Sequence, residues 1–158
     1  MAAQIAQHLG LALLSKDALL MALYEAFQFG PADASASMRT GAAAWAVFWH
    51  QAALCPQVVL DANIEWANEQ QLARLKSLEP GLVEVHCACP LETAMSRYAE
   101  RAQIGHAAQR YLTLDADRAA KYARPLNVGR LIEVDTTVPL SAKVVAELVE
   151  SALAEAAR

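Results

Sequence analysis

Hydrophobic positions along the chain form two alternating patterns. Four short, mostly apolar runs without helical spacing are typical of buried β-strands. The longer stretches between them place apolar residues three or four positions apart, which gives a helix one apolar face. We predict strands at 11–14, 58–61, 82–87 and 131–134, and helices at 4–9, 15–27, 41–54, 65–78, 91–102 and from 141 onward.

Residues at the predicted helix ends agree with these boundaries. Gly10 is a typical C-terminal stop for the first helix. Ser15 is a suitable N-cap for the second, and Pro90 suits the first turn of the fifth. The small residues of 30–37 predict a loop, whereas the polar stretch 103–129 has no clear pattern.

Three of these helices have a well-defined apolar face, which we expect to pack in the core. The central helix has an aromatic stripe, and core packing is the simplest interpretation of it. The expected faces are Leu19, Leu20, Leu23 and Phe27; Trp45, Phe48, Trp49 and Ala52; and Val144, Val145, Leu148, Val149 and Leu153.

Short apolar strands separated by helices predict a single α/β domain, a three-layer arrangement in which helices cover both faces of a parallel sheet. In such sheets, ligands bind beyond the carboxyl ends of the strands. The polar residues at these ends are therefore the first candidates for a functional site: Ser15, Lys16, Asp17, Asp61, Asn63, Asp135, Thr136 and Thr137.

Composition narrows the class of protein. The chain has 158 residues, 19% of them charged, and a net charge of −4, which argues against disorder and against general binding of duplex nucleic acid. Three cysteines, an odd number, favour reduced thiols and a cytoplasmic location. Residues 40–60 carry no charge, but His50, Gln51, Pro56 and Gln57 lie among them, so we expect no membrane span.

Basic residues gather in one part of the chain. Between Arg97 and Arg130 there are seven Arg or Lys and three Asp or Glu, which suggests an anion-binding, lid-like segment at 97–130. A solvated helical surface would have a similar composition, so both interpretations stay open.

Three motifs in register resemble the small P-loop kinases, in particular the zeta-toxin-like and chloramphenicol-phosphotransferase-like ATP-dependent kinases. They are H-L-G-L-A-L-L-S-K-D-A, V-V-L-D-A-N and L-V-E-V-H-C-A-C-P-L-E-T-A-M-S-R-Y-A-E-R. The resemblance covers nearly the whole chain and implies a P-loop NTPase-like fold.

The phosphate-binding loop of that family, G-x-x-x-x-G-K-[ST], does not occur in the 158 residues. The family's first strand, which lies in the middle of the sheet, is also missing ahead of the helix at 4–9. We expect either a start codon set too late, which we favour, or a remnant that closes its sheet in another way. An incomplete sheet predicts self-association through unpaired strand edges.

The resemblance implies a role for several residues around the acceptor. Asp17 matches the carboxylate that accepts the proton of the acceptor hydroxyl, Asp61 matches a Mg²⁺ ligand acting through water, and Arg39 and Asn63 fall in the acceptor-binding part. The alternatives are a helix-dipole partner for Asp17, a turn residue for Asp61 and an exposed surface cation for Arg39.

The resemblance also implies a nucleotide side of the site. Arg97 and Arg101, four residues apart on one helical face, match lid arginines that neutralise the transferred phosphoryl group. Arg110 is a further lid candidate, and Thr136 and Thr137 match the loop that borders the adenine. The alternatives are a solvated helix for the arginines and an ordinary turn for the threonines.

The function predicted from the sequence is an ATP- and Mg²⁺-dependent kinase that moves the γ-phosphoryl group to a small hydroxyl-bearing acceptor. Without the phosphate loop, the chain as written is expected to be inactive. The alternative is a non-catalytic kinase remnant that acts as an interaction or regulatory module, and a more remote one is a subunit of an α/β oligomer without a kinase role.

Overall fold

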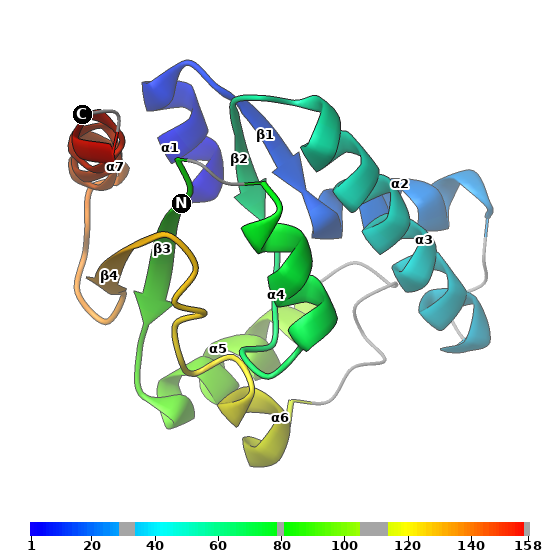
Figure 1. Cartoon of the computed structure of the whole chain (residues 1–158). Helices are drawn as coiled ribbons and strands as arrows, with labels where there is room; N and C mark the ends of the chain where they lie inside the picture. Colours follow the sequence, from blue (N-terminus) through cyan, green and yellow to red (C-terminus); the bar gives the residue numbers. More distant parts are fainter. Residues whose placement is uncertain (29–33, 79–80, 105–113, 157–158) are drawn as a thin grey trace.

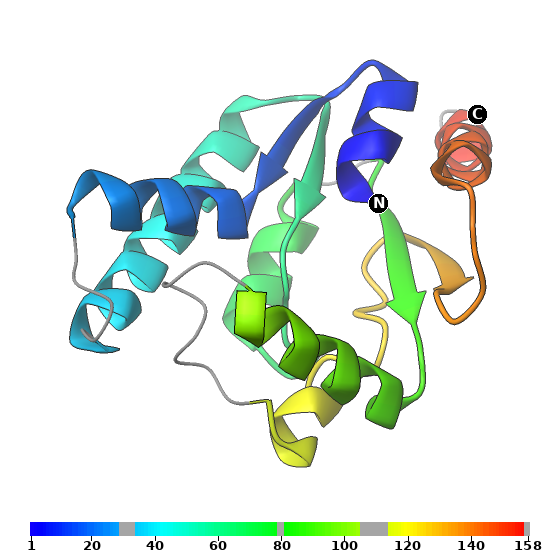
Figure 2. The ribbon, with the colours of Figure 1, turned by 180° about the vertical axis from the view of Figure 1, so that it is seen from behind.

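The computed structural model describes residues 1–28, 34–78, 81–104 and 114–156 (Figures 1 and 2). Parallel strands alternate with helices along the described chain, which confirms a mixed α/β fold. The elements are α1 (Ala2–Leu9), β1 (Ala12–Ser15), α2 (Lys16–Ala26), α3 (Ala34–Leu54), β2 (Val58–Asp61), α4 (Glu69–Lys76), β3 (Val83–Ala88), α5 (Leu91–Ile104), α6 (Ala116–Ala120), β4 (Arg130–Asp135) and α7 (Ala142–Ala156).

Local sequence signals set several of these boundaries. Gly10 ends α1 in the left-handed conformation, with φ at 65°, which glycine adopts without a steric cost. The Ser15 hydroxyl accepts the Ala18 amide at 3.4 Å and caps α2. The Asn68 side chain caps α4 in the same way, so α4 begins at Glu69 and not at residue 65 as predicted.

The four strands form two parallel pairs in the described part of the chain. β1 pairs with β2, with Ala12 opposite Val58 and Ser15 opposite Asp61. β3 pairs with β4, with Val83 opposite Arg130. The parallel direction agrees with the prediction, but in the described residues the single sheet that we expected is divided into two two-stranded sheets, and no strand of one pair hydrogen-bonds to a strand of the other.

Helices α1 and α7 lie side by side against the β3–β4 pair (Figure 1). Ile5 of α1 packs with Val134 of β4 and with Val145 and Ala146 of α7 in one buried cluster. This half of the molecule has a core of small and branched side chains.

The core on the other side of the molecule is aromatic. Phe48 is fully buried and Trp49 is 8% exposed; they pack with Leu75 of α4 and with Val128. Trp45 stacks on Trp49, with 5.7 Å between ring centroids. Core packing of the aromatic stripe, as predicted, is confirmed for Phe48 and Trp49.

The predicted apolar face of the last helix is partly wrong. Val144 and Leu148 of α7 are 45% and 49% exposed, whereas the alanines Ala146 and Ala152 are buried with Val145 and Val149. Small side chains allow α7 to lie close to α1, and this places the alanine side of the helix inward. Phe27, expected in the core, is 60% exposed.

Two further expectations differ from the structure. Helix α3 already begins at Ala34, within the predicted loop 30–37, and a short helix, α6, lies in the unassigned segment 103–129. Among the described residues, no helix combines the length and apolarity needed to cross a bilayer.

Candidate functional site

Two acidic side chains follow the β1–β2 pair. Ser15 and Asp61 are opposite each other in the strand register, so Asp17, in the first turn of α2, lies at the same end of the pair as Asp61. The Lys16 ammonium forms an ion pair with Asp17 at 2.8 Å. Lys16 also lies 5.7 Å from the ring centroid of Trp45, which holds this cation against α3.

The charges of two predicted site residues, Asp17 and Arg101, act on Tyr98 of α5. Burial raises the pKa of Tyr98, the positive charges of Arg118 and Arg101 act in the opposite direction, and the negative charge of Asp17 raises the pKa further. The charges of Asp17, Arg101 and Arg118 thus all act on the Tyr98 hydroxyl. Helices α2, α5 and α6 each contribute to this group, which we call the Tyr98 cluster: Asp17, Tyr98, Arg101 and Arg118.

Arg97 lies in a different set of contacts. Its guanidinium donates to the Thr136 hydroxyl at 3.2 Å and to the Thr136 carbonyl at 2.9 Å. The Arg101 Nε donates to the Arg97 carbonyl at 3.3 Å, as neighbouring turns of α5 allow. The two arginines predicted to act together thus point to different partners.

The loop after β4 is internally bonded. The Asp135 carboxylate accepts the Thr137 amide at 2.8 Å and the Thr137 hydroxyl at 2.7 Å. These hydrogen bonds lower the pKa of Asp135, and the Arg97 charge lowers it further. The Thr136 hydroxyl donates to the Ala88 carbonyl at 3.0 Å and joins the loop to β3.

The remaining candidates are more scattered. Asp61 is exposed at the end of β2, and its charge raises the pKa of Cys87 on β3, which is raised mainly by burial. Asn63 is exposed beyond β2, and Arg39 is exposed near the start of α3. Arg110 lies outside the described residues. No three His, Cys, Asp or Glu side chains gather into a metal site in the described part of the chain.

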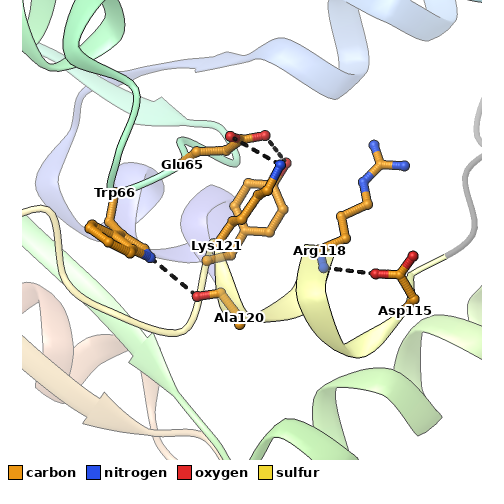
Figure 3. Close-up of polar contacts among 7 residues, drawn as sticks. Glu65, Trp66, Asp115, Arg118, Ala120 and Lys121 are labelled. Carbon is orange, nitrogen blue, oxygen red and sulfur yellow. Dashed lines mark hydrogen bonds and ion pairs between the residues drawn. The ribbon is translucent and has the colours of Figure 1, made fainter.

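A contact between the 62–68 loop and α6 was not foreseen from the sequence (Figure 3). The Trp66 indole donates to the Ala120 carbonyl at 3.2 Å, and the Trp66 amide donates to the Lys121 carbonyl at 3.1 Å. The Tyr122 hydroxyl donates to Glu65 at 3.4 Å, and Lys121 lies 3.9 Å from the same carboxylate. These contacts hold α6 against the segment that follows β2.

Arg118 connects this contact to the Tyr98 cluster. Its backbone amide is held by the Asp115 N-cap at 2.8 Å, and its side chain hydrogen-bonds Tyr122. Burial raises the pKa of Tyr122, and the charge of Glu65 adds to that rise. The Asp115 cap was the one sequence signal for α6, because the helix is short and has no apolar period.

Two hollows lie outside the Tyr98 cluster. An open groove of about 630 Å³ runs between α3 and α4 and is lined by Trp45, Trp49, His50 and Arg74, among others. A hollow of about 60 Å³ lies beside Cys87 and Cys89. Neither is lined by any of the acidic or basic residues predicted for the site.

Comparison with known proteins shows the fold. No protein-family model matches the chain, and no curated protein matches it. A crystal structure at 1.70 Å of a "putative kinase" from Chloroflexus aurantiacus J-10-fl is similar, with a TM-score of 0.77 and 23% identity over 95% of this chain and 88% of that one. The chain therefore has a mixed α/β fold like that of this protein.

Proposed function

We propose that the chain is a phosphotransferase of the P-loop kinase type that acts on a hydroxyl group of a small-molecule acceptor. The observation that carries the proposal is the Tyr98 cluster, in which the charges of a carboxylate from α2 and of arginines from α5 and α6 all act on the Tyr98 hydroxyl. The fold, similar to that of the Chloroflexus protein, supports it.

Asp17 is the proposed proton acceptor. As the acceptor oxygen forms its bond to phosphorus, its proton passes to the Asp17 carboxylate and the bond to the leaving phosphate oxygen breaks. Lys16 forms an ion pair with Asp17 and keeps it oriented at the start of α2. Asn63 and Arg39 are proposed to contact the acceptor.

Arg101 and Arg118 are proposed to neutralise the charge on the transferred group. Arginine suits this role because it stays charged and donates several hydrogen bonds in one plane. Arg97 is proposed to act with them on the nucleotide side, where it already holds Thr136. Thr136 and Thr137 would border the base of the nucleotide.

The residues of this chain fit the acceptor side of the reaction better than the nucleotide side. ATP is the implied donor of the phosphoryl group, but the 158 residues contain no glycine-rich loop to hold its phosphates. The described residues also form no cluster of three metal ligands, so Asp61 would contact Mg²⁺ only through water. We therefore assign the acceptor and charge-neutralising groups to this chain and assign it no phosphate cradle.

A second candidate function is a non-catalytic module that keeps the fold for interaction or regulation. The observation that favours it is that the 158 residues contain no G-x-x-x-x-G-K-[ST] motif. The two candidates differ in one measurable property, because a module without activity transfers no phosphate at any ATP concentration.

The test is transfer of labelled γ-phosphate from Mg-ATP at millimolar concentration to a panel of sugars, nucleosides and hydroxyl-bearing antibiotics. Because millimolar Mg-ATP offsets weak binding of the nucleotide, the proposal expects, in place of the inactivity expected from the sequence, transfer to at least one acceptor by the native chain, lost in Asp17→Asn and kept in the matched control Asp117→Asn on α6. Absence of transfer by the native chain, or equal transfer by both variants, contradicts it.

A further inference from the structure

A groove of about 630 Å³ lies between α3 and α4, and we call it the α3–α4 groove. Small-molecule sites typically have volumes of about 300–1,000 Å³, so the groove has the size of such a site. Its α3 wall combines small and large side chains on one helical face: Ala42, Ala46 and Ala53 leave the space, and Trp45 and Trp49 border it. No residue of the Tyr98 cluster is among the described residues that line it, so the groove is a separate site.

The α3 wall is aromatic. Trp45 and Trp49 lie one helical turn apart with stacked rings, 5.7 Å between centroids and 14° between planes. Trp49 packs against Leu75 in the core and is 8% exposed, whereas Trp45 is only partly buried. The core therefore fixes the direction of the rings, and Trp45 offers more aromatic surface to the groove. A fixed aromatic surface favours a ligand that is itself planar and aromatic.

The α4 wall supplies a positive charge. Of the described residues that line the groove, none is Asp, Glu or Lys, and Arg74 is the one that stays positively charged at any working pH. Its guanidinium carbon lies 5.9 Å from the ring centroid of Trp49, which holds the cation beside the aromatic wall. In the described part of the chain no carboxylate forms an ion pair with Arg74. The groove thus presents an arginine whose charge no acidic residue of the described lining offsets.

We propose that the α3–α4 groove binds a planar aromatic carboxylate, with the ring against Trp45 and the carboxylate on Arg74. Guanidinium and carboxylate match each other through two parallel hydrogen bonds. The Trp45 ring centroid and the Arg74 guanidinium lie 5.7 Å and 5.9 Å from the same point, the ring centroid of Trp49, so a two-ring ligand reaches both. His50 and Gln70, which also line the groove, can hydrogen-bond to polar substituents of the ring.

The charge in the groove decides between classes of aromatic ligand. A cationic compound would meet Arg74 with no acidic residue of the described lining to attract it. A neutral compound would cover Arg74 without replacing the hydrogen bonds that the guanidinium makes to water, and this costs free energy. An aromatic anion avoids both penalties.

Isothermal titration calorimetry with two probes of nearly the same shape tests the charge. Naphthalene-2-carboxylate and naphthalene-2-carboxamide share one ring system, and only the first is an anion. We expect the native chain to bind the carboxylate with a Kd below about 1 mM and the carboxamide at least about 10-fold more weakly, because hydrogen bonds between charged groups are the stronger ones. Absence of carboxylate binding at millimolar concentration, or equal binding of the two probes, overturns the proposal.

Two exposed basic residues of α4 give matched variants. Arg74→Gln removes the charge from the groove, and Lys76→Gln removes a charge from the same helix outside the groove lining. Arg74→Gln should weaken binding of the carboxylate about 10-fold or more and leave binding of the carboxamide unchanged, since only the anion uses the charge. Lys76→Gln should change neither. Equal carboxylate affinity in the two variants, both folded by circular dichroism, overturns the proposal.

Two exposed alanines of α3 test the location. Ala46→Leu fills part of the groove, and Ala43→Leu adds the same side chain to the helix outside the lining. Leucine is a strong helix former, so both variants keep α3. Ala46→Leu should weaken binding of naphthalene-2-carboxylate about 10-fold or more by steric clash, and Ala43→Leu should leave it unchanged. Full affinity in Ala46→Leu would place the probe elsewhere and overturn the proposal.

A third probe, decahydronaphthalene-2-carboxylate, tests the aromatic part. It keeps the charge and the carbon skeleton but has no π-face, so the native chain should bind it about 3-fold or more weakly than the aromatic carboxylate. Equal binding overturns the assignment of an aromatic ligand. The proposal does not rest on the kinase function: Asp17→Asn should bind naphthalene-2-carboxylate as the native chain does, so a failure of phosphoryl transfer and a failure of probe binding are observed separately.

Discussion

The polar groups beyond the two strand pairs are organised in different ways. Beyond β4, Asp135, Thr136 and Thr137 bond mainly to one another and to the neighbouring β3 and α5. Beyond β1, the charges of Asp17, Arg101 and Arg118, which come from three different helices, all act on the Tyr98 hydroxyl. Groups satisfied within one loop stabilise that loop, whereas charges gathered from three helices are not needed for local structure. The second arrangement is therefore the better candidate for chemistry.

The largest expected effect is on Asp17. Its change to asparagine removes the proton acceptor but keeps the size and the N-terminal position on α2. Turnover should fall about 100-fold or more while ATP affinity changes little, because the group acts only in the transition state. Steady-state kinetics and ATP titration of the same variant measure both. Lost ATP binding in a folded variant would instead make Asp17 a ligand of the nucleotide or metal.

The second largest expected effect is on the free energy of unfolding, through Glu84 on β3. The Glu84 carboxylate accepts the Leu126 amide at 2.6 Å and the Val128 amide at 3.2 Å. Glu84→Ala leaves both amides without this acceptor, and the free energy of unfolding should fall by about 2–3 kcal/mol. Urea denaturation measures it, with Glu133→Ala on exposed β4 as the control. Equal stability in the two variants would show that water replaces the carboxylate.

Arg101 and Arg97 test whether both regions take part in transfer. Arg101→Ala removes a charge near Asp17, and turnover should fall about 10-fold or more with an unchanged melting temperature. Arg97→Ala should lower turnover by a similar factor if Arg97 reaches the transferred phosphate. In that variant the Thr136 contacts are lost as well. If both variants keep full activity, the arginines belong to a solvated helix surface.

The smallest expected effect is on how the melting temperature depends on pH, through Asp135 at the end of β4. Asp135 has a pKa lowered below its ordinary value near 3.8 by hydrogen bonds from Thr137. A lowered pKa in the folded state stabilises the protein above the unfolded pKa, and this stabilisation is lost as the pH falls through the lower, folded value. Thr137→Val should therefore reduce the fall in melting temperature as the pH drops through and below 3.8, the ordinary value from which the pKa is lowered. Identical curves for the variant and the native chain would contradict the assignment.

Part of the fold could be predicted from the sequence because its signals are local. β2 was placed at 58–61, since an apolar run lies between Pro56 and the polar residues that follow it, and Gly10 marked the end of α1. The buried face of α7 could not be predicted by assuming that its largest apolar side chains are buried. Close packing on α1 buries alanines and leaves Leu148 exposed. The only sequence signal for α6 is its capping residue, Asp115.

Part of the candidate site could also be predicted from local signals in the sequence, and part could not. Asp17 was found because it follows a strand, and Arg101 because it lies four residues after Arg97 in a basic segment. Tyr98 and Arg118 could not be found, because their place depends on how α5 and α6 pack beside α2. The role of each residue stays a proposal until activity is measured.

The central claim is that this chain has the groups for phosphoryl transfer but no cradle for the phosphates of ATP. Isothermal titration of the native 158-residue chain with Mg-ATP tests it most directly. Because the 158 residues contain no glycine-rich loop with its lysine to hold the nucleotide phosphates, we expect a Kd in the millimolar range or weaker, a binding free energy of about −4 kcal/mol at best. Micromolar binding would contradict the account and would mean that the chain holds phosphate by another device.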